Sequence, residues 1–207
     1  HLHMQAPVVL ERQRSMRSRP PDRLVEEKAR LRQVCRDERQ HRAHDAGAPL
    51  AAAFLDAIPL APDAVVSGYW PFPDEIDPRP LLTALHACGH ALCLPVTEVG
   101  APLRFRAWTP CDVLVSGPFD TREPASNKPE QRPDCLLVPL LAVDDDGYRL
   151  GYGGGFYDRT LAVLGDALGV GLAFNFQRCG RLPRGAHDCP LDWLVTEDGA
   201  TRFARAA

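Results

Sequence analysis

Two charged residues flank a dense group of glycines in the second half of the chain. Gly151 and the run from Gly153 to Gly155 lie between Arg149 and Asp158. Glycine backbone can adopt positive φ and approach a ligand closely, and its N–H groups together with an arginine can hold a phosphate. The aspartate could face a metal ion bound to that phosphate. The pattern favours a phosphate-binding loop, with a glycine-rich turn that holds no ligand as the alternative.

Two common phosphate-binding loops do not fit this stretch. A P-loop ends in Gly-Lys-Ser/Thr, and no lysine follows any of these glycines. The dinucleotide-binding fingerprint would require a glycine where Phe156 stands. The sequence therefore indicates a loop of another kind.

The elements on either side of the glycines would present them to a ligand. The apolar run over residues 135–143 predicts a buried strand, and the apolar spacing over 157–164 predicts a short helix. This order places the positive end of a helix dipole beside the glycines. Further helices are predicted over residues 22–44, 49–58 and 80–88, and further strands over 64–70, 91–94, 103–108 and 168–174. This alternation predicts one three-layer α/β domain, with a mostly parallel sheet and helices on both faces.

Two of these elements carry other side chains of chemical interest. The first helix has Lys28 and Arg32 among interspersed acids, which is typical of a solvated, salt-bridged face. The strand over 64–70 ends at Trp70 and a group of prolines, so Glu75 lies on a loop at its carboxyl end. Open α/β sheets bind ligands at this edge. A solvated loop carboxylate is the alternative for Glu75.

Composition narrows the class of protein. With 207 residues, we expect a single domain over residues 22–207, preceded by a flexible lead-in over 1–21 whose first four residues resemble a cloning remnant. No run is apolar enough to span a membrane, and the net charge of −3 argues against general nucleic-acid binding.

The cysteines and histidines do not predict a metal or redox site. Seven cysteines form no C-x-x-C pair and follow no secretory signal, which indicates reduced thiols in the cytoplasm. Two histidines and two cysteines lie close together in the sequence: His86, Cys88, His90 and Cys93. Their spacing matches no standard zinc site, and we expect these side chains to serve packing.

The glycine stretch and the strand before it resemble a known family signature. Val138-Pro139-Leu-Leu-Ala-Val, followed by Gly147-x-Arg149-Leu-Gly-x-Gly-Gly-Gly-Phe-Tyr157-Asp158-Arg159, closely resembles that of the 5-formyltetrahydrofolate cyclo-ligases, also called 5,10-methenyltetrahydrofolate synthetases. The three successive glycines are similar to the bacterial branch. Weaker matches at Glu75, at Asn175-Phe-Gln177 and around His187-Asp188 extend the resemblance over about residues 22–199. Phe156 departs from the tyrosine found in many members.

The resemblance implies a reaction and a set of site residues. The reaction is ATP-dependent closure of 5-formyltetrahydrofolate to 5,10-methenyltetrahydrofolate, with phosphorylation of the formyl oxygen, attack by N10, and release of ADP and phosphate. The implied ATP-binding residues are Lys28, Arg32, Arg149, Gly151, Gly153, Gly154, Gly155, Phe156 and Tyr157. The implied folate-binding residues are Trp70, Glu75, Tyr152 and Tyr157, and the implied Mg²⁺ ligands are Asp158 and Asp188. Arg149 and Tyr157 are the implied catalytic residues.

Two other functions remain open at this point. One is a non-catalytic nucleotide-binding regulator that kept the phosphate loop, and Glu75 and Asp188 speak against it. The other is an RNA-associated module on the same fold, which the acidic net charge disfavours. For the enzyme we expect small-molecule substrates only, a monomer, and no nucleic-acid or membrane partner.

Overall fold

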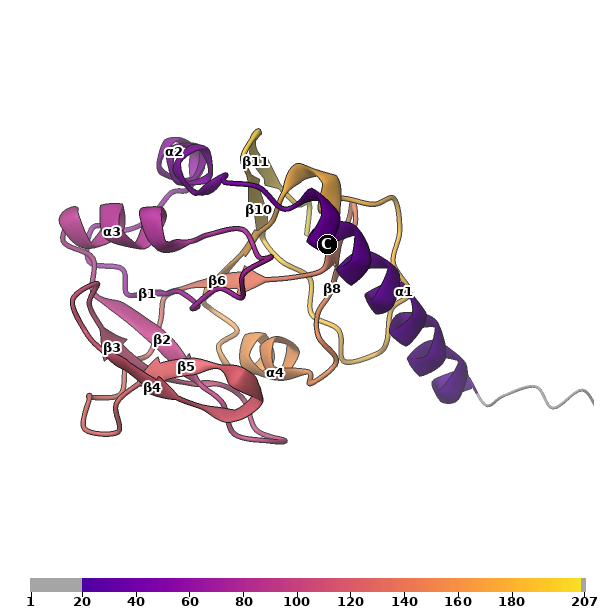
Figure 1. Cartoon of the computed structure of the whole chain (residues 1–207), viewed down its shortest axis with the longest axis horizontal. Coiled ribbons are helices and arrows are strands. Elements are labelled where there is room, and N and C mark those ends of the chain that lie inside the picture. The colour runs from indigo at the N-terminus through magenta and orange to yellow at the C-terminus, as the bar shows by residue number, and fades with distance from the viewer. Residues whose placement is uncertain (1–19, 206–207) are drawn as a thin grey trace, which may run out of the picture.

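A seven-stranded sheet forms the centre of the molecule (Figure 1). The computed structural model describes residues 20–205, so most of the predicted lead-in lies outside the described residues. Along the sheet the strands are β11 (Gly199–Arg202), β10 (Trp193–Thr196), β9 (Leu168–Leu172), β6 (Cys135–Pro139), β1 (Val66–Ser67), β2 (Leu92–Val96) and β3 (Arg104–Trp108). The strands from β10 to β2 pair in parallel, and the edge strands β3 and β11 pair antiparallel. The predicted mostly parallel sheet is therefore confirmed.

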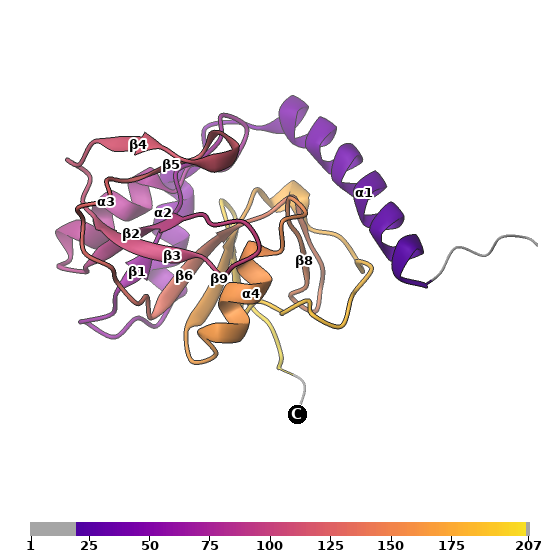
Figure 2. The same cartoon turned by 90° about the horizontal axis from the view of Figure 1, so that it is seen from below.

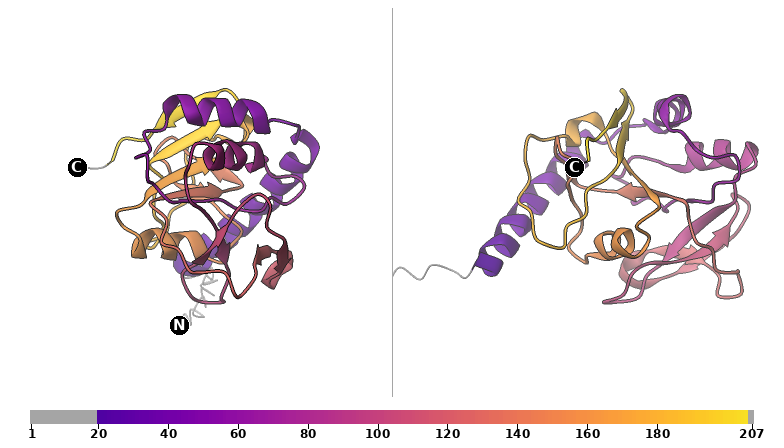
Figure 3. Two further views of the ribbon diagram at one scale, coloured as in Figure 1. Left: turned by 90° about the vertical axis from the view of Figure 1, so that its left-hand side faces the viewer. Right: turned by 180° about the vertical axis from the view of Figure 1, so that it is seen from behind.

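Helices cover both faces of this sheet, as predicted. Figures 1 and 3 show α2 (Gly47–Ala57) and α3 (Arg79–Ala87) on one side and α4 (Phe156–Val163) on the other. Alternate residues of β6 belong to the two cores: Leu137 packs on the α2–α3 side, and Leu136 and Val138 on the α4 side. A strand buried on both faces reads as a continuous apolar run. This explains why its sequence shows no alternation.

Two predicted strands differ most from the structure. The apolar run over residues 135–143 breaks after β6, and the chain resumes as β7 (Ala142–Val143), which pairs with β8 (Arg149–Leu150). At the break, the Leu140 carbonyl accepts hydrogen bonds from Arg39 and Gln177, so side chains replace the strand partners. The strand predicted over 64–70 is only β1, because the chain leaves the sheet towards prolines that lack an N–H donor.

The first helix, α1 (Pro20–Arg42), lies outside the three layers, along one end of the molecule (Figure 2). The sequence predicted this helix over residues 22–44, so both of its ends lie two residues earlier than expected. Its Leu31 and Cys35 pack against a small core under the β7–β8 hairpin. The remaining pair, β4 (Leu114–Ser116) and β5 (Arg122–Pro124), forms a separate antiparallel ribbon.

Residues 20–205 contain neither a membrane-spanning helix nor a cluster of metal-ligating side chains. No helix there is long and apolar enough to cross a membrane. No three metal-ligating side chains of the histidine, cysteine, aspartate or glutamate type are gathered there in a way that could hold a metal ion alone.

Candidate active site

A single cleft of about 1960 Å³ contains every residue that the sequence nominated for ATP, folate or metal binding. It opens at the carboxyl ends of the parallel strands, where Trp70 follows β1, Pro95 lies near the end of β2, and Pro139 ends β6. The α1 helix, the glycine loop and the segment around Asp188 supply its other walls. This is the edge at which open α/β sheets bind ligands.

The glycine loop connects β8 to α4 through backbone that favours glycine. Gly153 has φ +102° and Gly155 has φ +70°. Gly155 lies directly before α4, and no side chain of the described residues caps the first turn of that helix. Those N–H groups are therefore open to an anion from the cleft. At Gly154 a Cβ atom would come within 2.5 Å of the Phe156 ring, so a side chain at that position would displace the ring.

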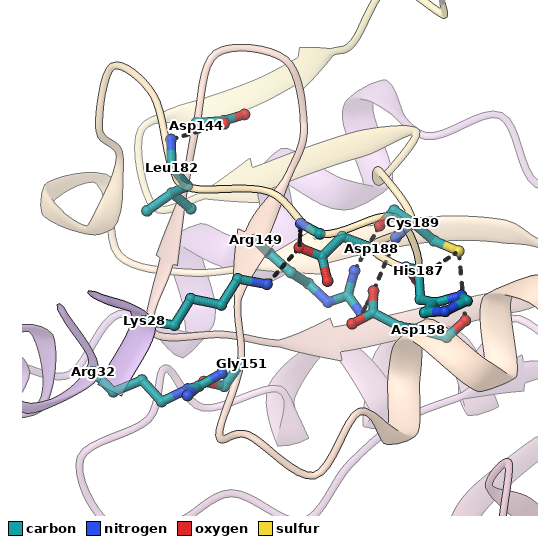
Figure 4. A network of polar contacts seen from close by, with 11 residues as sticks. Lys28, Arg32, Asp144, Arg149, Gly151, Asp158, Leu182, His187, Asp188 and Cys189 are labelled. Atoms are coloured by element: carbon teal, nitrogen blue, oxygen red, sulfur yellow. Dashed lines mark hydrogen bonds and ion pairs between the residues drawn. The ribbon is translucent and has the colours of Figure 1, made fainter. Parts of the chain in front are cut away.

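Arg149 is held rigidly at the base of the loop (Figure 4). Its side chain is only 5% exposed and donates to the Cys189 carbonyl at 2.8 Å and to Asp158 Oδ1 at 3.0 Å. The Cys189 N–H also donates to Asp158 Oδ1, at 3.0 Å. These bonds tie the start of α4 to the segment after Asp188 and fix a positive charge in the cleft.

The α1 helix directs two cations to the same end of the cleft. Lys28 Nζ contacts Asp188 Oδ2 at 2.5 Å, and Arg32 Nε donates to the Gly151 carbonyl at 2.9 Å (Figure 4). Burial by itself would raise the pKa of Asp188, but the Gly185 N–H and Lys28 lower it overall. The face of α1 that the charge pattern suggested was solvated is thus part of the cleft wall.

Asp158 and Asp188 form a donor set that suits Mg²⁺. Each carboxylate uses one oxygen for hydrogen bonds, and its second oxygen accepts none from the described residues. Magnesium commonly takes one or two carboxylates and completes its octahedron with phosphate oxygens and water. Two aspartates beside a phosphate loop meet that requirement.

The opposite part of the cleft is built around Glu75. Its side chain is 8% exposed; Oε1 accepts from the Phe72 N–H at 2.7 Å, and Oε2 accepts from the Tyr152 hydroxyl at 2.9 Å. Burial raises the pKa of Glu75, and the Phe72 N–H and nearby Arg39 only partly offset this effect. The glycine-loop residue Tyr152 therefore contacts the predicted folate pocket directly.

Aromatic rings form the walls beside Glu75. Trp70 is 37% exposed and packs edge-on against buried Trp108, with ring centroids 6.4 Å apart. Burial raises the pKa of Tyr157, and so does the charge of Glu75. Its hydroxyl therefore stays protonated at neutral pH and can donate a hydrogen bond. A planar, partly polar ligand would fit such walls.

Arg39 is the residue of this region that the sequence did not identify. The solvated face that the charge pattern predicts for this helix does not hold at Arg39, which is only 2% exposed and whose guanidinium reaches Tyr152. Its position was a usable signal, because Arg39 follows Arg32 by seven residues and therefore lies on the same helix face.

Comparisons with known proteins agree with one another. A sequence model of the 5-formyltetrahydrofolate cyclo-ligase family matches residues 11–197. The chain is 32% identical over 174 residues to the 5-formyltetrahydrofolate cyclo-ligase of Escherichia coli K12, covering 80% of this chain and 96% of that protein. The Haemophilus influenzae enzyme of the same name is 36% identical over 136 residues, or 61% of this chain and 73% of that one.

Solved structures agree with the sequence relatives. The 5,10-methenyltetrahydrofolate synthetase of Aquifex aeolicus superposes with a TM-score of 0.71 at 30% identity, over 87% of this chain and 94% of that one. The Mycoplasma pneumoniae synthetase superposes with a TM-score of 0.66 at 20% identity, over 83% and 99% of the two chains, and shares the fold.

Proposed function

The chain belongs to the 5-formyltetrahydrofolate cyclo-ligase family, and we propose that it converts 5-formyltetrahydrofolate and ATP to 5,10-methenyltetrahydrofolate, ADP and phosphate. The formyl oxygen attacks the γ-phosphorus and ADP leaves. N10 then attacks the formyl carbon and loses its proton, and the oxygen departs as part of phosphate. Phosphorylation is needed because a formamide oxygen is otherwise a very poor leaving group.

One observation carries this proposal: a single loop serves both halves of the cleft. Gly153 to Gly155 offer backbone N–H groups to a phosphate, while the neighbouring Tyr152 donates a hydrogen bond to Glu75. A donor and an acceptor bound on either side of this loop would be adjacent. Positioning of this kind supplies much of the rate enhancement in phosphoryl transfer.

In the ATP half, three cations would bind the triphosphate. Lys28 and Arg32 come from α1, and Arg149 is fixed beneath the loop. Arg149 is nearly buried and cannot lose its proton, so it would stabilise charge that develops on the transferred phosphoryl group. The glycine N–H groups and the first turn of α4 would bind the remaining oxygens.

Asp158 and Asp188 would hold Mg²⁺ through the oxygens that accept no hydrogen bond from residues 20–205. When bound there, the ion would screen charge on the phosphates. With the ion bound, the pairs that Lys28 and Arg149 make with these carboxylates would weaken, and both charges would be available to the triphosphate.

In the folate half, Glu75 and the aromatic walls would orient the pteridine ring. A carboxylate is a bidentate acceptor for the N–H groups of an aminopyrimidinone edge, and Trp70 offers an apolar face. Tyr157, at the start of α4, lines the cleft and is affected by the charges of both Glu75 and Arg149, and it would donate to the formyl oxygen or to the phosphoryl group.

The test is an ATP-dependent assay for methenyltetrahydrofolate, followed by its absorbance. We expect product only when Mg²⁺, ATP and 5-formyltetrahydrofolate are all present. ATP binding without product formation would favour a nucleotide-binding regulator instead. An Arg149→Ala variant that is folded and inactive would show that the cleft, and not a contaminant, makes the product.

A further inference from the structure

Arg39 is a charged residue buried at the edge of the cleft for which the proposed reaction has no direct use. Its side chain is 3% exposed, although α1 is otherwise rich in exposed charge. Burying a guanidinium is costly unless its donors are satisfied. Three groups satisfy it: Asp74 Oδ2 at 2.9 Å, the Leu140 carbonyl at 3.2 Å and the Tyr152 hydroxyl at 2.8 Å.

The chemistry of arginine fixes the direction of the bond to Tyr152. A guanidinium only donates, so the Tyr152 oxygen must accept from Arg39 Nη1. The Tyr152 hydroxyl proton is then free to point elsewhere, and Glu75 Oε2 lies 2.9 Å away. The result is a relay in which Arg39 donates to Tyr152 and Tyr152 donates to Glu75.

The same contacts hold the Tyr152 ring in place. The Arg39 guanidinium lies 5.6 Å from the centre of that ring, and the Phe72 ring packs edge-on against it at 6.2 Å. Tyr152 is otherwise 37% exposed and belongs to the glycine loop, which has no regular secondary structure. Arg39 thus anchors a loop residue to two fixed points, the α1 helix and the carbonyl at the end of β6.

We propose that Arg39 is a positioning residue for the folate substrate: it holds the Tyr152 hydroxyl, and through it the carboxylate of Glu75, in the orientation that receives the pteridine. This inference rests on the proposed function and adds a residue to its folate half. Arg39 makes no contact with the triphosphate end, which Lys28 and Arg32 serve from the same helix face. Its loss should therefore affect one substrate and not the other.

The experiment compares Arg39→Gln, Tyr152→Phe and the double variant with the wild-type chain. Each is assayed for the KM of both substrates and for 5-formyltetrahydrofolate binding by calorimetry. A hydrogen bond to a charged group corresponds to roughly a tenfold or larger change in affinity. We expect each single variant to weaken folate binding by about tenfold and to leave the KM of ATP unchanged. The double variant should be no weaker than the weaker single variant, because both remove one relay.

Arg30→Gln is the matched control, since Arg30 is exposed on the same helix and makes no hydrogen bond or ion pair among the described residues. It should leave both substrates unaffected. Arg39→Lys keeps the positive charge but lacks the guanidinium that reaches both Asp74 and Tyr152. It should therefore bind folate more tightly than Arg39→Gln but less tightly than the wild-type chain.

Several outcomes would overturn the inference. A folded Arg39→Gln with wild-type folate affinity would do so, and so would fully additive effects in the double variant. If Arg39→Gln does not fold, Tyr152→Phe decides, and unchanged folate affinity in that variant refutes the relay. Failure of the wild-type chain to bind 5-formyltetrahydrofolate would instead overturn the proposed function itself.

Discussion

Lys28 and Arg149 are the two cations nearest the aspartates that would bind magnesium, and each is paired with one of them. Lys28 contacts Asp188, and Arg149 contacts Asp158. These side chains are between 5% and 27% exposed, so their charges are screened less than surface charges would be. Magnesium on the carboxylates and phosphate on the cations would replace these two pairs without leaving a charge unpaired.

The Asp158→Asn variant tests whether Asp158 binds magnesium. Asparagine keeps an oxygen that can accept from Arg149 and from the Cys189 N–H, so the fold should persist. Removal of one anionic ligand should lower turnover by roughly 100-fold at limiting Mg²⁺, whereas 5-formyltetrahydrofolate should still bind. Turnover measured across a magnesium titration checks this, with Asp166→Asn at an exposed surface position as the control. Near wild-type turnover at limiting magnesium would refute the metal role.

The buried carboxylate of Glu75 predicts a pH dependence. Burial raises the pKa of Glu75, as does Asp74, while the Phe72 N–H, Arg39 and Tyr152 lower it and leave it above the ordinary range. The carboxylate is charged above its pKa and becomes protonated as pH falls through it. The kcat/KM for folate should therefore fall on acidification at a pH above the usual glutamate value of about 4.3.

Glu75→Gln is the variant that checks this assignment. It should have a lower kcat/KM for folate, and the acid limb of its pH profile should disappear. The kcat/KM for ATP, measured over the same pH range, controls for other titrating groups. An unchanged acid limb in Glu75→Gln would assign the ionisation to another residue.

At the scale of elements, the glycine loop depends on both its backbone and the helix beside it. Gly153 has φ +102°, and a Cβ added there would lie 3.4 Å from the Arg32 guanidinium carbon. Any side chain would thus strain the backbone, and its Cβ would touch a cation that reaches the loop from α1. The loop and α1 are therefore in contact although they are far apart in the sequence, as the proposed triphosphate site requires.

Gly153→Ala and Gly100→Ala separate backbone strain from ligand binding. Both glycines have positive φ, and Gly100 is exposed with open space around its Cα. Each substitution should lower the free energy of unfolding by about 1–2 kcal/mol. Only Gly153→Ala should also raise the KM of ATP, because only that loop faces the cleft. Thermal denaturation and ATP kinetics on both variants check this, and an equal effect on ATP would place the binding site elsewhere.

The same elements show what the sequence could predict. The strand before the glycines, the glycine loop and α4 follow one another in the chain, so their order and type could be inferred from the local sequence pattern. The helices that cover the sheet could be inferred in the same way. The break at Leu140 could not, because apolar residues continue through it and the bonds that stabilise it come from Arg39 and Gln177. The hairpin of β10 and β11 at the edge of the sheet was not predicted as strands at all.

Arg39 illustrates why part of the site was also missed. Its partners Asp74, Leu140 and Tyr152 are 35, 101 and 113 positions away in the sequence. A helix of mixed charge gives no local sign that one arginine is buried, because that depends on tertiary packing. Lys28 and Arg32 were predicted from the family resemblance, and both line the cleft together with the other predicted site residues.

At the scale of the whole molecule, the parallel sheet and α1 together enclose one cleft that suits two substrates. Loops at the carboxyl ends of the strands line the side proposed for folate, and α1 with the glycine loop lines the side proposed for the triphosphate. The residues that flank the glycines offer no obvious base for a water molecule, since Arg149 is a cation and Asp158 would hold magnesium. The formyl oxygen, and not water, is thus the expected phosphoryl acceptor.

The measurement that tests this account most directly is phosphate release with and without 5-formyltetrahydrofolate, recorded together with methenyltetrahydrofolate formation. ATP and Mg²⁺ alone should release little phosphate. Addition of the folate should raise release sharply, with one phosphate formed per methenyl product, and Glu75→Gln should reduce both outputs in parallel. Substantial phosphate release without folate, or a Glu75→Gln variant that forms methenyl product at the wild-type rate, would contradict the account.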